Sequence, residues 1–245
     1  DLEPQLAPLG VEKTMLIQAA ATVHETEYML GLADATPSIA GVVGWIDFED
    51  PGQATTLDRL SQHPAFKGVR PMIQDIPDDD WMLRDDVQWA YQALADRDLT
   101  FDALGFPRHL ANFLTIFTRY PELRCVVDHC MKPDIHGHSD ASFAFWADGM
   151  RRIARETGAY CKLSGLTSEA SPEWRLEDLK PYAHHVIDVF GPDRVMWGSD
   201  WPVVRLRAEY PRWRDAAEAL TADLSPEQRA QIFGGTAAAF YGIAT

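Results

Sequence analysis

The sequence predicts an α/β protein, a (β/α)8 TIM barrel formed as a single domain over residues 1–245. Three observations support this fold class. Short apolar runs alternate with helical patterns along the whole chain, and strictly alternating βα units build a parallel sheet. No glycine-rich phosphate-binding motif follows an early strand, as it would in most open nucleotide-binding sheets. Polar residues recur at the carboxyl ends of the predicted strands, where barrel enzymes place their chemistry.

Seven apolar runs, each closed by small or polar residues, are predicted to be strands: Lys13–Ala19, Ile39–Phe48, Lys67–Ile73, Thr100–Phe106, Arg124–Cys130, Ala159–Leu166 and Arg194–Pro202. Helical patterns occupy Thr26–Ala35, Gln53–His63, Asp85–Asp98, His109–Tyr120, Ser142–Thr157, Leu176–Phe190 and Ala208–Leu220. A last helix is predicted at Pro226–Tyr241, with Ser225 as its N-cap, because serine caps helices well and proline suits the first helical position.

The number of predicted strands falls one short of a closed barrel, which needs eight. A seven-stranded sheet would expose an edge of unpaired backbone. The chain starts with Asp1, and a helix-like stretch at Pro4–Leu9 leads directly into the first predicted strand. We therefore expect strand 1 of the barrel to lie upstream of Asp1 and to be missing from this sequence.

The composition narrows the possible partners. The formal net charge of −15 argues against nucleic acid or an anionic membrane, although a local cluster of arginine and lysine can still bind an anionic small molecule. Three cysteines cannot form a disulfide framework and are interpreted as buried free thiols of a cytoplasmic protein. No apolar stretch is long enough to cross a membrane. The expected partner is a small-molecule substrate, and the oligomeric state cannot be predicted.

Asp200 is the first candidate catalytic residue. It ends the last predicted strand, in the run Gly198-Ser199-Asp200-Trp201-Pro202. Because side chains alternate along a strand, an inward Asp200 places Gly198 on the same face and leaves room beneath the carboxylate. A carboxylate at the top of a barrel can act as a general base on water or as a metal ligand. An N-cap role is disfavoured because Trp201 and Pro202 follow at once.

A second group of candidates follows the strand Arg124–Cys130. If His129 points into the barrel, where it could ligate a metal or polarise a carbonyl, then its neighbour Asp128 points outward. Lys132 could reach back over the mouth of the site or be a solvated loop lysine. The pair His136 and His138 has metal-binding spacing, but it lies in a loop rather than at a strand end.

Several other strand-end residues are candidate substrate ligands. Arg70 suits a carboxylate or a carbonyl, because its guanidinium forms paired hydrogen bonds. Lys162 and Ser164 share one face of a strand, and a lysine inside a barrel needs an anionic partner or a lowered pKa. Gln18, Trp45 and Trp201 also end strands. Gln18 could bind substrate hydroxyls and a tryptophan could pack on a ring, but either role competes with plain core packing.

These strand ends resemble the amidohydrolase-2 type family, the metal-dependent-hydrolase barrels that include L-fuconolactonase, L-rhamnono-lactonase and 2-pyrone-4,6-dicarboxylate lactonase. The resemblance spans nearly the whole chain. It rests on Gly68-Val69-Arg70, Asp128-His129-x-x-Lys132-Pro133, Lys162-Leu163-Ser164-Gly165, Gly198-Ser199-Asp200-Trp201-Pro202 and the tail from Phe233 to Tyr241. Two features depart from the family pattern: the strand-one His-x-His is absent, and Cys130 and Met131 follow His129 where relatives often carry a glycine.

The resemblance implies a hydrolase that opens a small lactone, most simply a sugar lactone in carbohydrate catabolism. Asp200 would activate water, His129 would meet a metal or the scissile carbonyl, and Arg70 and Lys162 would orient substrate oxygens. If the enzyme uses one divalent ion, zinc or manganese, then His129 and Asp200 would be its ligands. The enzyme could equally be metal-independent. Two alternatives stay open: a metal-dependent decarboxylase or hydratase of the same superfamily, and a non-catalytic barrel that binds a sugar acid.

Overall fold

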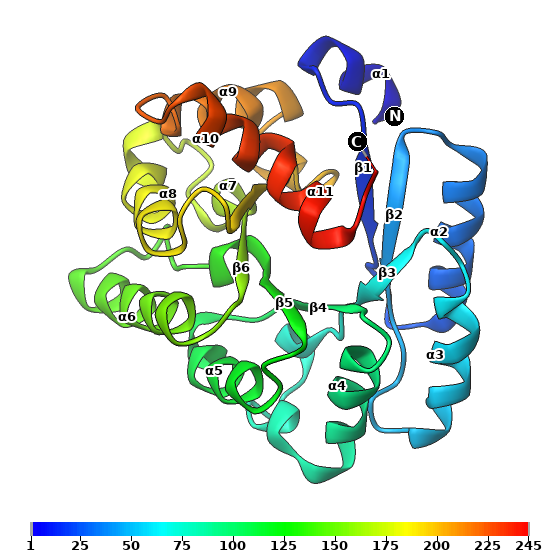
Figure 1. The fold of residues 1–245 in the computed structure, drawn as a ribbon. Coiled ribbons are helices and arrows are strands. Elements are labelled where there is room, and N and C mark those ends of the chain that lie inside the picture. Colours follow the sequence, from blue (N-terminus) through cyan, green and yellow to red (C-terminus); the bar gives the residue numbers. More distant parts are fainter. Residues whose placement is uncertain (1, 245) are drawn as a thin grey trace.

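The computed structural model describes residues 2–244 and contains one parallel sheet of seven strands in the order β1-β2-β3-β4-β5-β6-β7. The strands are β1 Thr14–Ile17, β2 Ile39–Gly44, β3 Phe66–Val69, β4 Thr100–Ala103, β5 Arg124–Val127, β6 Tyr160–Leu163 and β7 Val195–Trp197. Each strand pairs with the next one along the chain, and the sheet curls with its helices on the outside (Figure 1). The seven predicted strands and the parallel α/β barrel architecture are confirmed. The strand expected upstream of Asp1 lies outside the sequence.

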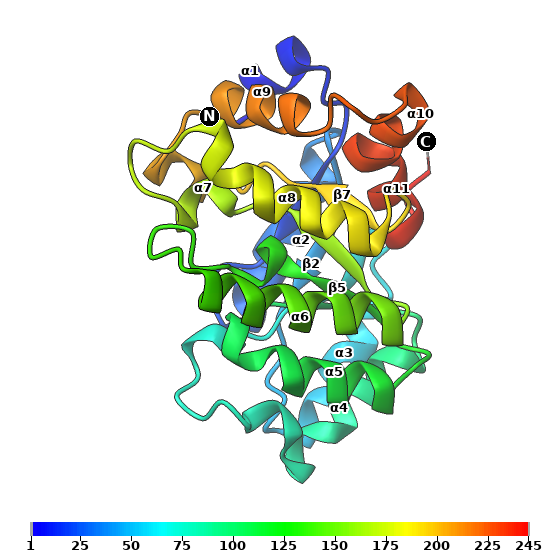
Figure 2. The same ribbon diagram turned by 90° about the vertical axis from the view of Figure 1, so that its left-hand side faces the viewer.

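The helices that follow the strands are α2 Val23–Ala35, α3 Ala54–Ser61, α4 Gln88–Ala95, α5 Leu110–Arg119, α6 Asp140–Glu156, α8 Leu176–Phe190 and α9 Tyr210–Leu220. They surround the outside of the curled sheet (Figure 1), and α4, α5, α6 and α8 stack side by side on the face that Figure 2 shows. A short α1, Glu3–Leu6, precedes β1, and another short helix, α7 Leu166–Glu169, follows β6 directly. None of the helices in residues 2–244 is both long and apolar enough to span a membrane.

The predicted last helix is divided in the structure. Ser225 caps α10, Pro226–Ala230, as expected, since its side chain accepts a hydrogen bond from the Gln228 N–H. The helix then widens into a π-helical turn at Gln231–Gly235 and continues as α11, Thr236–Tyr241. The prediction of one continuous helix over Pro226–Tyr241 was therefore wrong, although the predicted first and last residues were correct. A π turn of this kind is a local insertion that helical periodicity does not show.

Two apolar clusters form the core, one on each face of the sheet. Alternation along the strands separates them: Val42 and Val127 pack outward against the helices, whereas Val43 and Val126 point into the barrel. The inner cluster also contains Met196 from β7 and the last two residues of α11, Phe240 and Tyr241, with side chains of β1 packed against them. In Figure 1, α11 (red) lies between β7 and β1. The last two residues of the C-terminal helix therefore help to fill the barrel interior.

Candidate active site

The site begins with an unusual turn at the end of β5. Four consecutive residues, His129 to Lys132, have positive φ angles, between 47° and 59°. Residues other than glycine seldom adopt this left-handed conformation, which costs about 1–2 kcal/mol each. The turn is held in place because the Trp146 indole N–H donates to the Cys130 carbonyl at 2.7 Å. Strain of this kind persists where surrounding contacts impose it, often at functional sites.

This turn corrects the predicted orientation of Asp128. Its side chain points into the barrel with Val126 and is fully buried, so the expectation that it faces outward was wrong. The physical reason is that the left-handed residues after Asp128 end the strand's alternation, which lets Asp128 and His129 both reach the interior. The predicted inward orientation of His129 is compatible with its contacts, which are to Ser164 and Asp200.

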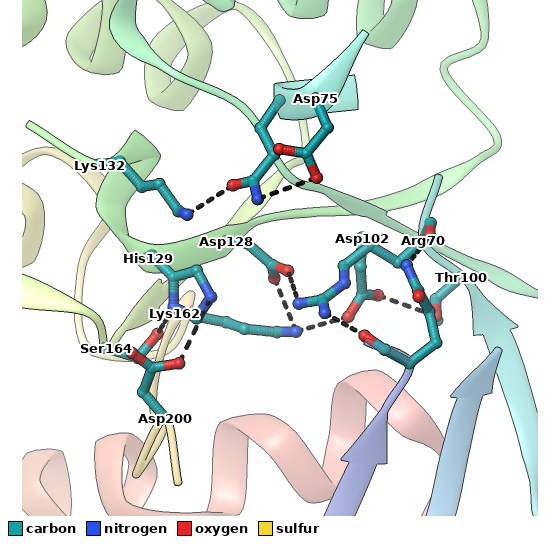
Figure 3. Close-up of polar contacts among 12 residues, drawn as sticks. Arg70, Asp75, Thr100, Asp102, Asp128, His129, Lys132, Lys162, Ser164 and Asp200 are labelled. Atoms are coloured by element: carbon teal, nitrogen blue, oxygen red, sulfur yellow. Dashed lines mark hydrogen bonds and ion pairs between the residues drawn. The ribbon is translucent and has the colours of Figure 1, made fainter. Parts of the chain in front are cut away.

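His129 and Asp200 lie together at the carboxyl ends of β5 and β7 (Figure 3). The His129 Nε2 atom is 3.7 Å from Asp200 Oδ1, and Nδ1 is 2.9 Å from the Ser164 hydroxyl. The other carboxylate oxygen of Asp200 accepts a hydrogen bond from the Ser168 hydroxyl at 3.3 Å. Burial lowers the pKa of His129, and the negative charges of Asp200 and Asp128 only partly oppose this, so the ring is neutral near pH 7.

Two glycines allow this arrangement. Gly165, just after β6, has a φ of +70°, and a Cβ atom there would lie 2.6 Å from His129 Cβ. Gly198, at the end of β7, would bring a Cβ within 3.1 Å of Ser164 Cβ. The room predicted beneath the Asp200 carboxylate is therefore taken by Ser164, the hydrogen-bond partner of His129.

Deeper in the barrel, four charged side chains form a second cluster, which we call the inner charge network: Arg70, Asp102, Asp128 and Lys162. Lys162 Nζ lies 2.5 Å from Asp102 Oδ2 and 2.7 Å from Asp128 Oδ1. Arg70 Nη1 lies 3.0 Å from Asp128 Oδ2. Two positive and two negative groups balance within the network, and both carboxylates are fully buried. Figure 3 shows Lys162 extending between the two aspartates.

The charges in this network shift one another's pKa values. Burial alone would lower the pKa of Lys162, but its two carboxylate neighbours outweigh burial and raise it. Burial alone would raise the pKa of Asp128, yet Lys162 and Arg70 hold it well below the ordinary 3.8. The pKa of Asp102 is raised by burial, with Lys162 opposing the shift. Lys162 thus has the anionic partners that the sequence demanded of a lysine inside a barrel.

The remaining predicted substrate ligands follow the strands at the same end of the barrel. Gln18 is fully buried, and its amide donates to the Arg70 carbonyl at 2.5 Å. Lys132 is partly buried and donates to Gln74 Oε1, also at 2.5 Å. Trp45 and Trp201, both half-buried, follow β2 and β7. Of the loop histidines, His138 contacts the Tyr182 hydroxyl at 2.6 Å, and His136 is exposed, with its backbone N–H donating to the Glu169 carbonyl at 3.0 Å.

Several residues of the site were missed from the sequence. Asp102 and Thr100 lie on one face of β4, two residues apart, so strand alternation could have identified Asp102 as an inward polar residue. Ser168 and Gln74 lie in short helical segments after β6 and β3, where nothing in the local pattern marks them. Tyr241 comes from the far end of the chain, and no local signal could place it.

The candidate metal ligands His129 and Asp200 supply two donors. Within residues 2–244 there is no group of three His, Cys, Asp or Glu side chains arranged to hold a metal ion. The described side chains therefore do not fit a complete divalent-metal site, because zinc in proteins generally takes three or four protein ligands. The chemistry available at this site is that of a carboxylate base, a neutral imidazole and a nearby ammonium group.

A parallel barrel with ionisable side chains gathered at the carboxyl ends of its strands defines an α/β-barrel enzyme. The amidohydrolase family model matches residues 1–243, so the chain belongs to the amidohydrolase family and is a hydrolase. It is 42% identical over 248 residues to an L-fucono-1,5-lactonase of Burkholderia ambifaria, covering 99% of this chain and 84% of that protein. An L-fucono-1,5-lactonase of Burkholderia multivorans is 32% identical, with the same coverage of 99% and 84%.

A solved structure extends the similarity to the fold. An amidohydrolase from Burkholderia multivorans, determined with bound zinc, superposes with a TM-score of 0.93 at 31% identity. The match covers 99% of this chain and 87% of that one. The barrel fold predicted from the sequence is therefore shared with a crystallographically determined member of the family.

Proposed function

We propose that this chain hydrolyses a sugar lactone to its hydroxy acid, and that L-fucono-1,5-lactone is the first substrate to test. One observation carries the proposal: Asp200 and His129 face each other 3.7 Å apart at the strand ends of a chain that is 42% identical to an L-fucono-1,5-lactonase. A carboxylate beside a neutral imidazole is suited to activating water against an ester carbonyl.

In this proposal Asp200 is the general base. The Ser168 hydroxyl occupies one of its oxygens, which leaves Oδ1, on the His129 side, to take a proton from water. The water oxygen forms a bond to the lactone carbonyl carbon, and the carbonyl oxygen becomes an oxyanion. When the ring C–O bond breaks, the proton on Asp200 passes to the departing ring oxygen. The product is an open-chain hydroxy acid, whose carboxyl group then releases one proton to the solvent.

Lys132 and His129 are the proposed groups for the oxyanion. Among the described residues 2–244, Lys132 has no direct ion pair: its ammonium group contacts the neutral amide of Gln74 and the face of Phe106, and the Glu169 carboxylate interacts with it at longer range. Its charge is thus available to a developing negative charge, which a preorganised donor stabilises more than it stabilises the ground state. The Ser164 hydroxyl orients the His129 ring through Nδ1 and leaves Nε2 directed toward the reacting region.

The inner charge network favours an uncharged substrate over a dicarboxylate. Arg70 and Lys162 would be the natural ligands of a dicarboxylate, but Asp102 and Asp128 already neutralise both. A dicarboxylate placed there would compete with buried carboxylates for the same cations. We therefore propose that Arg70, Lys162 and Gln18 support the floor of the site, and that Trp45 and Trp201 pack beside a polyhydroxylated ring.

A pH-indicator assay tests the function, because each turnover releases acid. The wild-type protein is expected to acidify a solution of L-fucono-1,5-lactone, whereas Asp200→Asn is expected to lower kcat by about 1,000-fold with little change in Tm. The matched control is Asp148→Asn, which removes an exposed carboxylate on α6 whose ion pair, within the described part of the chain, is with Arg151. Full activity in Asp200→Asn would remove the base from the scheme. Assays with a chelator, and with zinc or manganese restored, measure any contribution of a divalent ion.

A further inference from the structure

The C-terminal helix reaches the inner charge network through a single residue. Phe240 and Tyr241 end α11 and are 2% and 3% exposed. Their backbone is fixed at the amino-terminal ends of two strands, because Arg124 donates to the Phe240 carbonyl and Lys67 donates to the Gly242 carbonyl at 3.4 Å. The Tyr241 side chain therefore enters the barrel from the end opposite the candidate active site and has little freedom to move.

The hydroxyl of Tyr241 meets the carboxylate that holds Lys162. It donates to Asp102 Oδ2 at 2.8 Å, and Lys162 Nζ lies 2.5 Å from the same oxygen. The Lys162 ammonium is also 5.9 Å from the centre of the Tyr241 ring. Because burial raises the pKa of Tyr241 well above 10, its hydroxyl keeps its proton and remains a donor. Tyr241 and Lys162 thus share one acceptor, and each limits where the other can lie.

A chain of contacts leads from this point to the candidate catalytic residues. Lys162 bridges Asp102 to Asp128. Asp128 is the residue immediately before the left-handed turn that carries His129 and Lys132. A donor that satisfies Asp102 leaves Lys162 free to pair with Asp128 as well. Without that donor, the carboxylate of Asp102 would depend on Lys162 alone, apart from a 3.4 Å contact with Thr100, and would draw the ammonium away from Asp128.

We propose that Tyr241 is a positioning residue for the active site: through Asp102 and Lys162 it keeps Asp128, and with it the turn bearing His129, in the catalytic arrangement. The inference rests on the proposed lactone hydrolysis for its kinetic test. It assigns to the C-terminal helix a role beyond filling the barrel interior. On this account the hydroxyl of Tyr241 matters as well as its ring, because a phenylalanine of almost the same shape would fill the same space without the hydrogen bond to Asp102.

The test compares Tyr241→Phe with Tyr91→Phe. Tyr91 is also fully buried, but its hydroxyl has no hydrogen-bond partner among the described residues, so its removal measures the loss of a buried hydroxyl alone. We expect Tyr241→Phe to lower kcat on L-fucono-1,5-lactone by about 10-fold, the effect of losing a hydrogen bond to a charged group, with KM changed less than about twofold. Tyr91→Phe is expected to keep kcat within about twofold of wild type.

A double-mutant cycle identifies the path of the effect. If Tyr241 acts through Asp102, then adding Tyr241→Phe to Asp102→Asn lowers kcat little further. If the two residues act independently, the fold-losses in kcat of the two single variants multiply, which means that their free energies add. Additive losses, an unchanged kcat in Tyr241→Phe or an equal loss in Tyr91→Phe would each overturn the proposal. If Asp102→Asn does not fold, the comparison between the two tyrosine variants decides alone.

A spectroscopic measurement separates this inference from the function itself. The ring signals of the eight histidines can be followed by NMR, with His129 assigned from His129→Asn. The His129 signal is expected to move in Tyr241→Phe and to stay in place in Tyr91→Phe, whether or not the protein opens a lactone. An unmoved His129 signal would overturn the positioning role. A wild-type protein without lactonase activity would overturn the proposed function and leave this readout intact.

Discussion

The inner charge network and the His129–Asp200 pair contain the same kinds of groups but differ in how completely their charges are satisfied. In the network, Lys162 lies within 2.7 Å of two carboxylates, both fully buried. In the pair, His129 and Asp200 are 3.7 Å apart, and their side chains are 14% and 11% exposed. Lys162 and Arg70 are about as exposed as the pair, at 10% and 11%, so the two regions differ in ion pairing and not in exposure. The cations of the network are neutralised by carboxylates, whereas Asp200 keeps one carboxylate oxygen that no cation occupies.

This difference suggests a division of labour within one barrel. Buried ion pairs gain little net stability over apolar packing, but breaking one leaves an unpaired charge at high cost, so such networks fix geometry more than they add stability. A loosely paired carboxylate and imidazole near solvent can instead change partners during a reaction. We therefore expect substitutions in the network to affect stability first, and substitutions around the pair to affect turnover first.

The largest stability effect is expected for Asp128→Asn. The substitution keeps the shape of the side chain but leaves Lys162 and Arg70 with one carboxylate between them. Removal of one member of a buried ion network typically costs about 3–5 kcal/mol of unfolding free energy. Urea unfolding measures this loss. The exposed Asp148→Asn is the control, with an expected change below about 0.5 kcal/mol.

The pH dependence of that loss gives a second check. The pKa of Asp128 in the folded state lies below its ordinary 3.8, so its contribution to stability is present above that pH and disappears as the pH falls further. Wild type and Asp128→Asn should therefore converge in stability on acidification below pH 3.8. A difference between the two proteins that stays constant with pH would show that Asp128 does not act through its charge.

The next largest effect is expected for Gly165→Ala, which acts on the catalytic pair. The added Cβ would lie 2.6 Å from His129 Cβ, at a backbone position with a φ of +70°. His129 must move, and a displacement of about 1 Å at a reacting group can lower the rate about 100-fold. We expect kcat to fall by about 10- to 100-fold, measured with the pH-indicator assay. Gly158→Ala, where a Cβ would meet nothing within 4 Å, should stay near wild type.

The two regions also differ in how well the sequence predicted them. Asp200 and His129 could be found because each closes an apolar strand, and the ends of parallel strands meet at one edge of a barrel. The inner network was only half visible. Arg70 and Lys162 were recognised, but Asp102 was overlooked within an apolar strand, although its alternation with Thr100 marked it as inward.

Two features of the site could not be predicted from local patterns. Asp128 points inward in step with Val126, but His129 also reaches the interior only because four left-handed residues follow Asp128, none of which is a glycine, and the sequence therefore carries no signal of the turn. The Tyr241–Asp102 contact joins positions 139 residues apart and depends on how the C-terminal helix enters the barrel. Periodicity predicts elements and the faces they bury, whereas contacts of this range depend on the assembled fold.

The smallest effect is expected for Ser164→Ala, which removes the hydroxyl that contacts His129 Nδ1 at 2.9 Å. A neutral hydrogen bond contributes about 1 kcal/mol, so kcat should fall about 5-fold while Tm changes little. Ser61→Ala, on the far side of the sheet in α3, is the matched control. Kinetics and thermal unfolding of both variants give the answer. A large loss of stability with unchanged kcat would contradict this expectation. Ser164 would then act like the residues of the inner charge network, which maintain the fold, and not as a partner of His129 in turnover.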